Sequence, residues 1–416
     1  MTSRASTAAD QQPSSLWRNR DFILLWGGQT VSTLGSTMSD IAFGLLVLQI
    51  THSKSQVAFV ASIRALPFLV LTLPAGALMD LWDRKRVMQL SDLGRAACLA
   101  SIAFALLSGR LPLSQLYIVA LAEGALATLY TIAALAGVTR VVPKAQLGRA
   151  TSATYVSSNT VSLVGPLLGT SLFTLARALP FVADAFTYLV SAASLAWIRG
   201  EFQGRHARSE RHILHELAVQ LATGFTWLWQ QPVLRFQALA GCVLSLALYP
   251  TTALVIVLTD RLPTPQPSIG VVFTFGAIGG LVGGLVGSWF QRRLPFGFIM
   301  SAMFALLAVF FACYIAAPSV IWLGVILAAI SLVESIGSIA NLTYRLAQTP
   351  DEYQGRVNSI HRFVGFGVGR PLGAALLGVL FISIGLNASI LVFSAVLALF
   401  AVATALYRPV RTASYG

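Results

Sequence analysis

Long apolar runs recur along the chain, and short polar segments separate them. Twelve runs are long enough to cross a bilayer as helices, since a helix needs about 20 apolar residues to span ~30 Å of hydrocarbon. The alternating segments of about ten residues that a membrane β-barrel would require do not occur in the sequence. The pattern therefore predicts an all-α membrane protein with twelve transmembrane helices, at 22–50, 56–79, 87–108, 113–136, 150–175, 179–198, 232–258, 269–289, 296–317, 320–344, 357–383 and 386–407.

The polar segments divide these spans into two groups of six. We therefore predict an N-terminal tail (1–21), a six-helix bundle (22–198), a central loop (199–231), a second six-helix bundle (232–407) and a C-terminal tail (408–416). The N-terminal segment lacks the apolar core and cleavage site of a signal peptide, so we expect the first span to be retained. Apolar positions in the central loop predict an interfacial helix, with a metal site at His212 and His215 as the alternative.

Composition and charge support a membrane location and give an orientation. The chain is 56% hydrophobic and 10% charged, whereas a soluble domain carries about 25% charged residues. With the N-terminus inside, 21 of the 28 lysines and arginines fall in inner segments and 4 in outer segments. The positive-inside rule then predicts cytoplasmic termini in a multi-pass protein of the cell (inner) membrane. Anionic lipid accounts for the net charge of +13, so we expect no nucleic-acid partner.

The two halves of the chain repeat one another. A Pro-x4-Gly-Arg motif occurs at 143–149, before the fifth predicted span, and again at 350–356, before the eleventh. Each of these spans also carries a proline midway, at Pro166 and at Pro371. Because the fifth and eleventh spans hold the same place in their halves, the pattern predicts two pseudo-symmetric six-helix halves.

A charged cluster lies between the second and third spans. In "GALMDLWDRKRV" (76–87), five charges occupy the seven positions from Asp80 to Arg86. The stretch resembles the pattern Gly-x-Leu-Ala-Asp-x-x-Gly-Arg-Lys/Arg of the major facilitator superfamily. Asp83 replaces the second glycine, which is typical of its drug and siderophore exporters. The residues that match the pattern are Gly76, Leu78, Asp80, Arg84 and Lys85.

The resemblance to this exporter branch covers most of the chain. It includes "LLVLQITHS" (45–53), "SDLGRA" (91–96), "VVPKAQLGRATS" (141–152) and "FVADAFTYLVSA" (181–192). Gly165, Pro166 and Gly169 in "VGPLLG" resemble the Gly-Pro motif of antiporter branches. The resemblance implies the major facilitator fold and a secondary transporter.

The charges of the cluster predict a cytoplasmic gate. A helix N-terminus attracts a carboxylate, and Asp80 lies at the membrane level where the eleventh span begins after Gly355. A glycine at 76 would let two helix ends approach closely. The residues that we assign to the gate are Gly76, Asp80, Asp83, Arg84, Lys85, Arg86, Gly355 and Arg356. The alternative is that the cluster only anchors the orientation of the chain.

Ionisable residues deep in apolar spans are costly and usually functional. The resemblance implies that spans one, four, seven and ten line a central cavity, and Asp40, Glu123 and Glu334 lie in three of them. A carboxylate in a cavity of low dielectric can bind and release a proton near neutral pH, so these are the proton-coupling candidates. For Asp40, the alternative is a hydrated position near the outer end of its span. Arg64 is the candidate counter-charge for Asp40 or Glu123, and Arg370 for an anionic substrate or for Glu334.

Three further charges and a glycine-rich run have structural interpretations. Asp92 and Arg95, three residues apart, are predicted to pair with each other or with the charged cluster. Asp184 is predicted to cap or pack near the outer end of the sixth span. The run "GAIGGLVGGLVG" (276–287) lies in an apolar span, so it predicts a close contact between helices and not a nucleotide-binding loop.

These features together predict a transporter and not an enzyme. No G-x-x-x-x-G-K-[ST] motif for ATP occurs, and we expect no cofactor and no metal. We expect proton antiport to drive export of a small amphipathic or aromatic compound, such as a siderophore or a drug. The expected partners are that substrate, protons and the lipid bilayer, and we expect a monomer. The alternatives are an importer of the same fold and a non-transport membrane receptor or scaffold.

Overall fold

The protein is a bundle of helices, seen in a computed structural model, and no strand occurs in the part of the chain that the structure describes. Within that part, eleven helices are long and apolar enough to cross a membrane. The prediction of an all-helical membrane protein is therefore confirmed. The structure describes residues 16–142, 146–199, 202, 223, 225–249, 251–259, 262, 267–350, 353, 357–358, 360–361 and 363–413.

The first six long helices overlap the first six predicted spans. They are α1 (Arg20–Thr51), α2 (Lys54–Leu81), α3 (Arg84–Leu107), α4 (Leu113–Val141), α5 (Leu147–Leu175) and α6 (Leu179–Trp197). The asparagine before α1, Asn19, caps that helix, because its side-chain oxygen accepts a hydrogen bond from the Phe22 backbone nitrogen at 3.2 Å. In α5 the apolar part is the shorter stretch Thr160–Leu175, so this helix is not among the eleven.

The second half follows the predicted spans, with one irregular helix. The predicted span 232–258 corresponds to one apolar stretch, Pro232–Leu258, which contains α8 and α9. The predicted span 357–383 contains a π-helical segment, η4, which leads directly into α14. Pro371, near the start of α14, has no N–H to bond one turn back, and this favours the wider π-turn before it. The helices of this half are α8 (Pro232–Leu248), α9 (Thr251–Thr259), α10 (Pro267–Arg293), α11 (Phe296–Cys313), α12 (Val320–Gln348), η4 (Phe363–Gly369), α14 (Arg370–Ser383) and α15 (Gly385–Leu406). Three short helices complete the chain, η1 (Leu16–Arg18), η3 (Tyr314–Ala316) and α16 (Arg408–Arg411).

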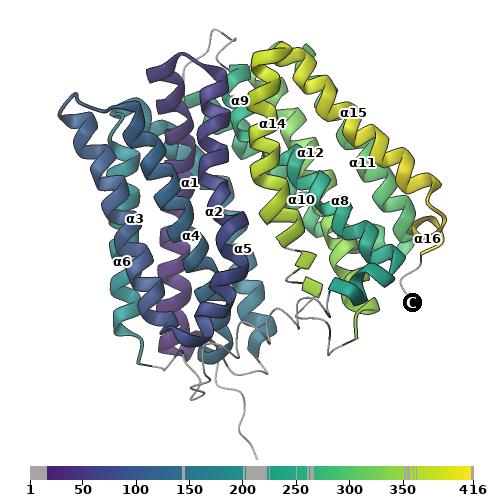
Figure 1. Ribbon diagram of the computed structural model, residues 1–416, viewed down its shortest axis with the longest axis horizontal. Helices are drawn as coiled ribbons and strands as arrows, with labels where there is room; N and C mark the ends of the chain where they lie inside the picture. The colour runs from purple at the N-terminus through teal and green to yellow at the C-terminus, as the bar shows by residue number, and fades with distance from the viewer. Residues whose placement is uncertain are drawn as a thin grey trace, which may run out of the picture.

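The helices form two bundles that lie side by side (Figure 1). Helices α1 to α6 pack mainly on one another, and α8 to α15 do the same. The bundles meet chiefly through two helix pairs, α5 with α10 and α2 with α14. We call the end of the molecule that carries Arg84, Lys85, Arg86, Arg292 and Arg293 the basic end.

The two bundles are in direct contact at the end opposite the basic end. Gly270, in the first turn of α10, faces α5, and a β-carbon placed on it would lie 2.8 Å from the Leu167 Cα. Gly378 of α14 faces the first turn of α2, where the same construction comes within 3.5 Å of the Ser55 carbonyl oxygen. The second contact is ordinary van der Waals packing, whereas the first leaves no room for a side chain.

The glycine-rich run of α10 packs against α12. A β-carbon on Gly279 would lie 2.7 Å from the Ala328 Cα, and one on Gly283 would lie 2.9 Å from the Leu332 Cα. Both distances are shorter than any real contact of a β-carbon, so only glycine allows the two backbones to approach this closely. The predicted close contact between helices is therefore confirmed.

Candidate functional site

An arginine of α2 joins two carboxylates in the first bundle. The Arg64 guanidinium forms an ion pair with Asp40 of α1 through one nitrogen. Its other terminal nitrogen lies 2.5 Å from Oε2 of Glu123 on α4. The Glu123 side chain is only 1% exposed, whereas that of Asp40 is 47% exposed. The Asp40 carboxylate is therefore accessible, whereas the Glu123 carboxylate is enclosed by protein.

A second arginine binds the buried carboxylate from the other side. Nη2 of Arg95, on α3, lies 3.1 Å from Oε1 of Glu123 and donates a hydrogen bond to it. The Tyr188 hydroxyl of α6 donates to the same oxygen at 3.2 Å, and the Arg95 guanidinium lies 4.1 Å from the centre of the Tyr188 ring. Two arginines and two carboxylates thus form one network whose formal charge is zero. The prediction that Arg95 pairs with Asp92 or the charged cluster was wrong, because its charge is directed at Glu123.

Close packing of α2 on α4 makes this network possible. Gly124 follows Glu123 directly, and a β-carbon on it would lie 3.3 Å from the Arg64 Cα and closer still to the Arg64 carbonyl group. Glycine therefore permits the approach that brings the Arg64 guanidinium to the Glu123 carboxylate.

Two more acids are buried in the first bundle, and their surroundings differ. The Asp184 carboxylate, which is fully buried, accepts hydrogen bonds from the Ser39 hydroxyl and, at 3.0 Å, from the Thr187 hydroxyl. Asp92 is also 0% exposed, but neither of its oxygens has a hydrogen-bond partner among the described residues. Asp184 is therefore a buried packing residue whose carboxylate has hydrogen-bond partners, whereas the Asp92 carboxylate has none among the described residues.

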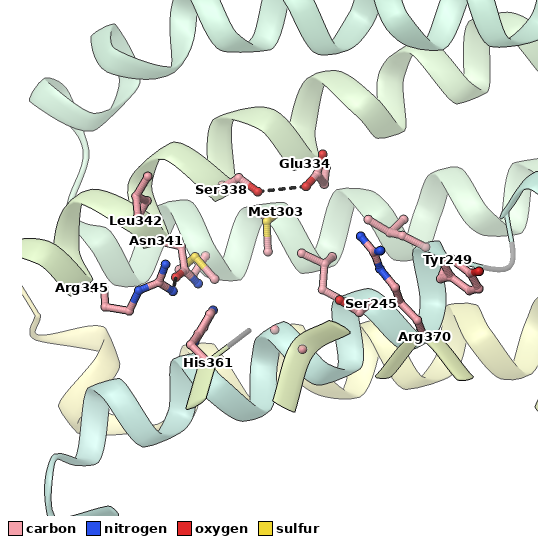
Figure 2. A pocket seen from close by; sticks show the side chains of 16 residues that line it. Ser245, Tyr249, Met303, Glu334, Ser338, Asn341, Leu342, Arg345, His361 and Arg370 are labelled. Carbon is pink, nitrogen blue, oxygen red and sulfur yellow. Dashed lines mark hydrogen bonds between the residues drawn. The ribbon is translucent and has the colours of Figure 1, made fainter. Parts of the chain in front are cut away.

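The second bundle encloses a cavity of about 480 Å³. Figure 2 shows its lining, which comes from α8, α11, α12 and the segment from His361 to Arg370. Apolar side chains such as Leu244, Met300 and Met303 share the wall with polar ones. A cavity of this size with a few convergent polar groups suits a small amphipathic molecule.

The acid of this cavity is Glu334. The Ser338 hydroxyl donates a hydrogen bond of 2.9 Å to its carboxylate (Figure 2), and Glu334 forms no ion pair with any described residue. Arg370 lies in the same lining with its guanidinium 5.5 Å from the centre of the Tyr249 ring. The structure therefore places Arg370 and Glu334 around one cavity without joining them in an ion pair.

Two cavity residues were missed by the sequence reasoning. Arg345 donates hydrogen bonds to the Asn358 side chain at 2.9 Å and to the Asn341 side chain at 3.4 Å, and His361 lies beside it in the lining (Figure 2). The predicted tenth span ended at 344, so Arg345 was counted as a loop cation, although α12 continues to Gln348. The histidine inside the predicted eleventh span was an available signal.

The charged cluster makes contacts within its own bundle. The Asp83 carboxylate accepts hydrogen bonds from the backbone nitrogens of Lys85 and Arg86, at 3.0 and 3.3 Å, and so caps α3. The Lys85 ammonium donates to the Ile198 carbonyl oxygen at 2.7 Å, at the end of α6. These contacts fix the loop between α2 and α3 to α6.

Other predicted gate residues lie outside the described residues. This applies to Gly355 and Arg356, to the surroundings of Gly76 and to the side chain of Asp80. It applies also to the central-loop segment 203–222, where the interfacial helix and the histidine pair were predicted.

The glycine–proline motif of α5 lies at a junction of three helices. A β-carbon on Gly165 would lie 2.8 Å from the Thr37 Cβ of α1, and one on Gly169 would lie 2.8 Å from the Met38 Cα. On the next face of α5, the Pro166 carbonyl oxygen lies 3.1 Å from a β-carbon built on Gly270 of α10. The motif therefore lets α5 pack closely on its own bundle and on the other bundle.

Relatives of known function include two exporters. The chain is 28% identical over 372 residues to the multidrug efflux pump Tap of Mycolicibacterium fortuitum, covering 86% of this chain and 89% of Tap. It is 26% identical over 362 residues to the enterobactin exporter EntS of Escherichia coli, covering 84% of this chain and 82% of EntS. The resemblance to drug and siderophore exporters is therefore confirmed.

Solved structures share the architecture. A bacterial homologue of the lysosomal transporter Spinster, in an inward-facing occupied conformation, aligns with a TM-score of 0.73 and 13% identity over 96% of this chain and 98% of that one. The nucleoside transporter NupG aligns with a TM-score of 0.70 and 13% identity, over 92% and 98%. Similarity at this identity establishes the fold alone. The sequence model of the Major Facilitator Superfamily matches residues 25–369 of this chain. On this match, and with two helical bundles that enclose buried charges and a polar cavity, the chain belongs to the major facilitator superfamily of transporters.

Proposed function

We propose that the protein is a proton-coupled exporter, an antiporter that moves a small amphipathic or aromatic compound out of the cell. A siderophore or a drug-like molecule is the substrate class that we favour. Similarity to Tap and EntS supports export. An importer of the same fold is the alternative, and it differs only in the direction of net transport.

The proposed architecture has twelve spans in two pseudo-symmetric halves, 22–198 and 232–407. The tails 1–21 and 408–416 and the central loop 199–231 lie in the cytoplasm, and the basic end faces the cytoplasm across the inner membrane. The lysine and arginine distribution supports this orientation. Since the bundles touch at the opposite end, the arrangement is closed to the outside, and the substrate reaches the cavity of the second bundle from the cytoplasm.

The observation that carries proton coupling is the bridge that Arg64 makes between Asp40 and Glu123. Asp40 is the accessible member, so a proton can reach it and cancel one of the two attractions that hold Arg64. The guanidinium then remains with Glu123 alone, and the ion pair between α1 and α2 is lost. A proton bound at this site therefore changes the forces between helices, as coupling requires.

Glu334 is the corresponding group of the second bundle. Its carboxylate lies in the cavity with a single hydroxyl partner and no ion pair among the described residues, so its charge is available to a proton or to a cationic group of the substrate. Arg370 provides the opposite charge in the same lining for an anionic group. We propose that proton and substrate compete for this cavity.

The gate proposal rests on the sequence of the charged cluster. We propose that Asp80, in the last turn of α2, faces the start of the eleventh span near Gly355 and Arg356. The helix dipole attracts the carboxylate when the bundles close at the basic end. Asp83 and Lys85 hold the loop in place, which is the anchoring role considered as the alternative for the whole cluster.

Accumulation in everted membrane vesicles tests this function, with ethidium as an aromatic cation and 2,3-dihydroxybenzoate as an aromatic anion. An inside-acid gradient should drive uptake of at least one probe, and dissipating the gradient should abolish it. Glu123→Gln and Glu334→Gln should lose gradient-driven uptake while probe binding stays measurable. Ser383→Ala, at an exposed position of α14 outside the cavity lining, is the control. Normal gradient-driven uptake by both glutamine variants would refute the proposed roles of the carboxylates.

A further inference from the structure

Three buried polar side chains of the first bundle lie together without hydrogen bonds among the described residues. They are Asp92 of α3, Tyr130 of α4 and Ser191 of α6, and each has its polar atoms enclosed by protein. Ser191 lies within weak hydrogen-bonding reach of both of the others, and Gln29 within that of Tyr130, but none of these contacts has the geometry of a full hydrogen bond. Satisfied buried polar groups are the rule in proteins, so three unsatisfied ones at one place call for a ligand.

Among these three buried groups, Asp92 is the most costly to leave without a partner, because its side chain can carry a charge. Helix α3 packs on α4 and α6. The titratable groups beside Asp92 are Arg95 of its own helix and Tyr130 of α4, while Glu123, Tyr188 and Asp184 surround Arg95. Arg95 is the cation beside Asp92, and its guanidinium is directed to Glu123. An ionised carboxylate buried without a partner is far more costly than a neutral one, so the carboxyl group binds a proton instead.

A polar cavity adjoins the cluster. It has a volume of about 260 Å³, and Tyr130 belongs both to its lining and to the cluster. Hydroxyl groups from two other helices surround it, from Thr30 and Thr33 of α1 and from Thr154 and Ser157 of α5. A lining of this kind holds water and conducts protons without offering a competing charge.

The position of the cluster along the helices connects it to the arginine network. Tyr130 follows Glu123 by seven residues on α4, which is about 10 Å toward the basic end at the helical rise. Asp92 precedes Arg95 by three residues, so the two side chains leave neighbouring turns of α3 on the same side. A change of charge at Asp92 therefore acts on the guanidinium that holds Glu123.

We propose that Asp92 is a second proton-binding residue of the first bundle, supplied from the basic end through the hydroxyl-lined cavity beside Tyr130. The Tyr130 hydroxyl gives its proton to the Asp92 carboxylate and takes one from water in the cavity, and the reverse steps return the proton. When Asp92 is protonated, Arg95 stays with Glu123. When it is ionised, its negative charge attracts Arg95 and weakens the hold on Glu123. This role rests on the proposed proton coupling, but the protonation of Asp92 is tested separately from it.

Infrared difference spectroscopy on the full chain in lipid nanodiscs tests the protonation. A protonated carboxyl group absorbs apart from a carboxylate, and its band shifts in heavy water. We expect Asp92→Asn to remove one component of the protonated-carboxyl band. Glu123→Gln should leave that component in place, since two arginines hold Glu123 ionised. Asparagine is neutral and close in size to the protonated acid, so we expect normal folding, checked by gel filtration. A band unchanged by Asp92→Asn would overturn the proposal.

Transport separates a proton-binding role from a structural one. A coupling free energy between two sites changes affinity by about 5- to 150-fold, so Asp92→Asn should reduce the gradient-driven accumulation of ethidium or 2,3-dihydroxybenzoate by at least about fivefold. Exchange of the same probe without a gradient should stay within about twofold of the wild type, and Asp92→Glu should restore accumulation in part. Equal losses of accumulation and exchange, or normal accumulation by Asp92→Asn, would overturn the coupling role. If neither probe is transported by any variant, the proposed function fails while the infrared result still decides the protonation of Asp92.

Discussion

A methyl group at Gly270 should shift the balance between the two conformations of the transporter. In Gly270→Ala the new β-carbon would lie 2.8 Å from the Leu167 Cα, across the contact between the two bundles. Carbon atoms pack at about 3.5–4.0 Å, so α5 and α10 must separate by about 1 Å at this point. Neither the methyl group nor the Leu167 backbone can rotate away. The clash exists only while the bundles touch at this end.

The size of the shift follows from the energy of overpacking. Extra methyl groups in a packed interior cost about 1–3 kcal/mol. Because the conformation open at this end does not carry this cost, the equilibrium should move toward it by about 5- to 150-fold, at tenfold per 1.4 kcal/mol. Electron spin resonance distances between labels at Ser108 and Ala316, exposed positions at the same end of the two bundles, measure the open fraction.

Gly279→Ala is the matched control. Its β-carbon would lie 2.7 Å from the Ala328 Cα, but both helices of that contact belong to the second bundle. The clash is then present in both conformations, so this variant should lower the thermal stability and leave the label distances unchanged. Both changes replace glycine by alanine in α10, so their effects on helix propensity cancel. Distances in Gly270→Ala that match those of the wild type, or an equal shift in Gly279→Ala, would refute the reasoning.

Two further predictions concern orientation and the charged cluster. A cysteine placed at Ser108 should react with an impermeant thiol reagent added to intact cells, whereas one placed at Arg199 should react only after the cells are opened; the reverse pattern would contradict the cytoplasmic position of the basic end. Lys85→Met removes the hydrogen bond to the Ile198 carbonyl oxygen at the end of α6, so it should lower stability by about 0.5–1.5 kcal/mol. Thermal unfolding of the purified protein measures this loss, and an unchanged midpoint would show that the ammonium group does not anchor α6.

The sequence by itself determined the fold class and the family of this protein. Apolar runs of membrane length predict helices whatever their neighbours are, because a backbone in lipid must satisfy its own hydrogen bonds. Prolines also act locally, so the irregular backbone before Pro371 could have been expected from the residues alone. The glycine run of α10 predicted a close helix contact, because residues without a side chain let another helix backbone approach.

The list of buried charges was readable from the sequence, but their partners were not. Sequence spacing made Asp92 the natural partner of Arg95, whereas the structure directs Arg95 to Glu123 on another helix. The tertiary structure also brought Arg345 and His361 into one cavity with Glu334, although they come from different predicted segments. A charge in a helix can turn to any of several neighbours. Its partner depends on the rotation and depth of each helix in the bundle, which side-chain packing across the whole bundle decides.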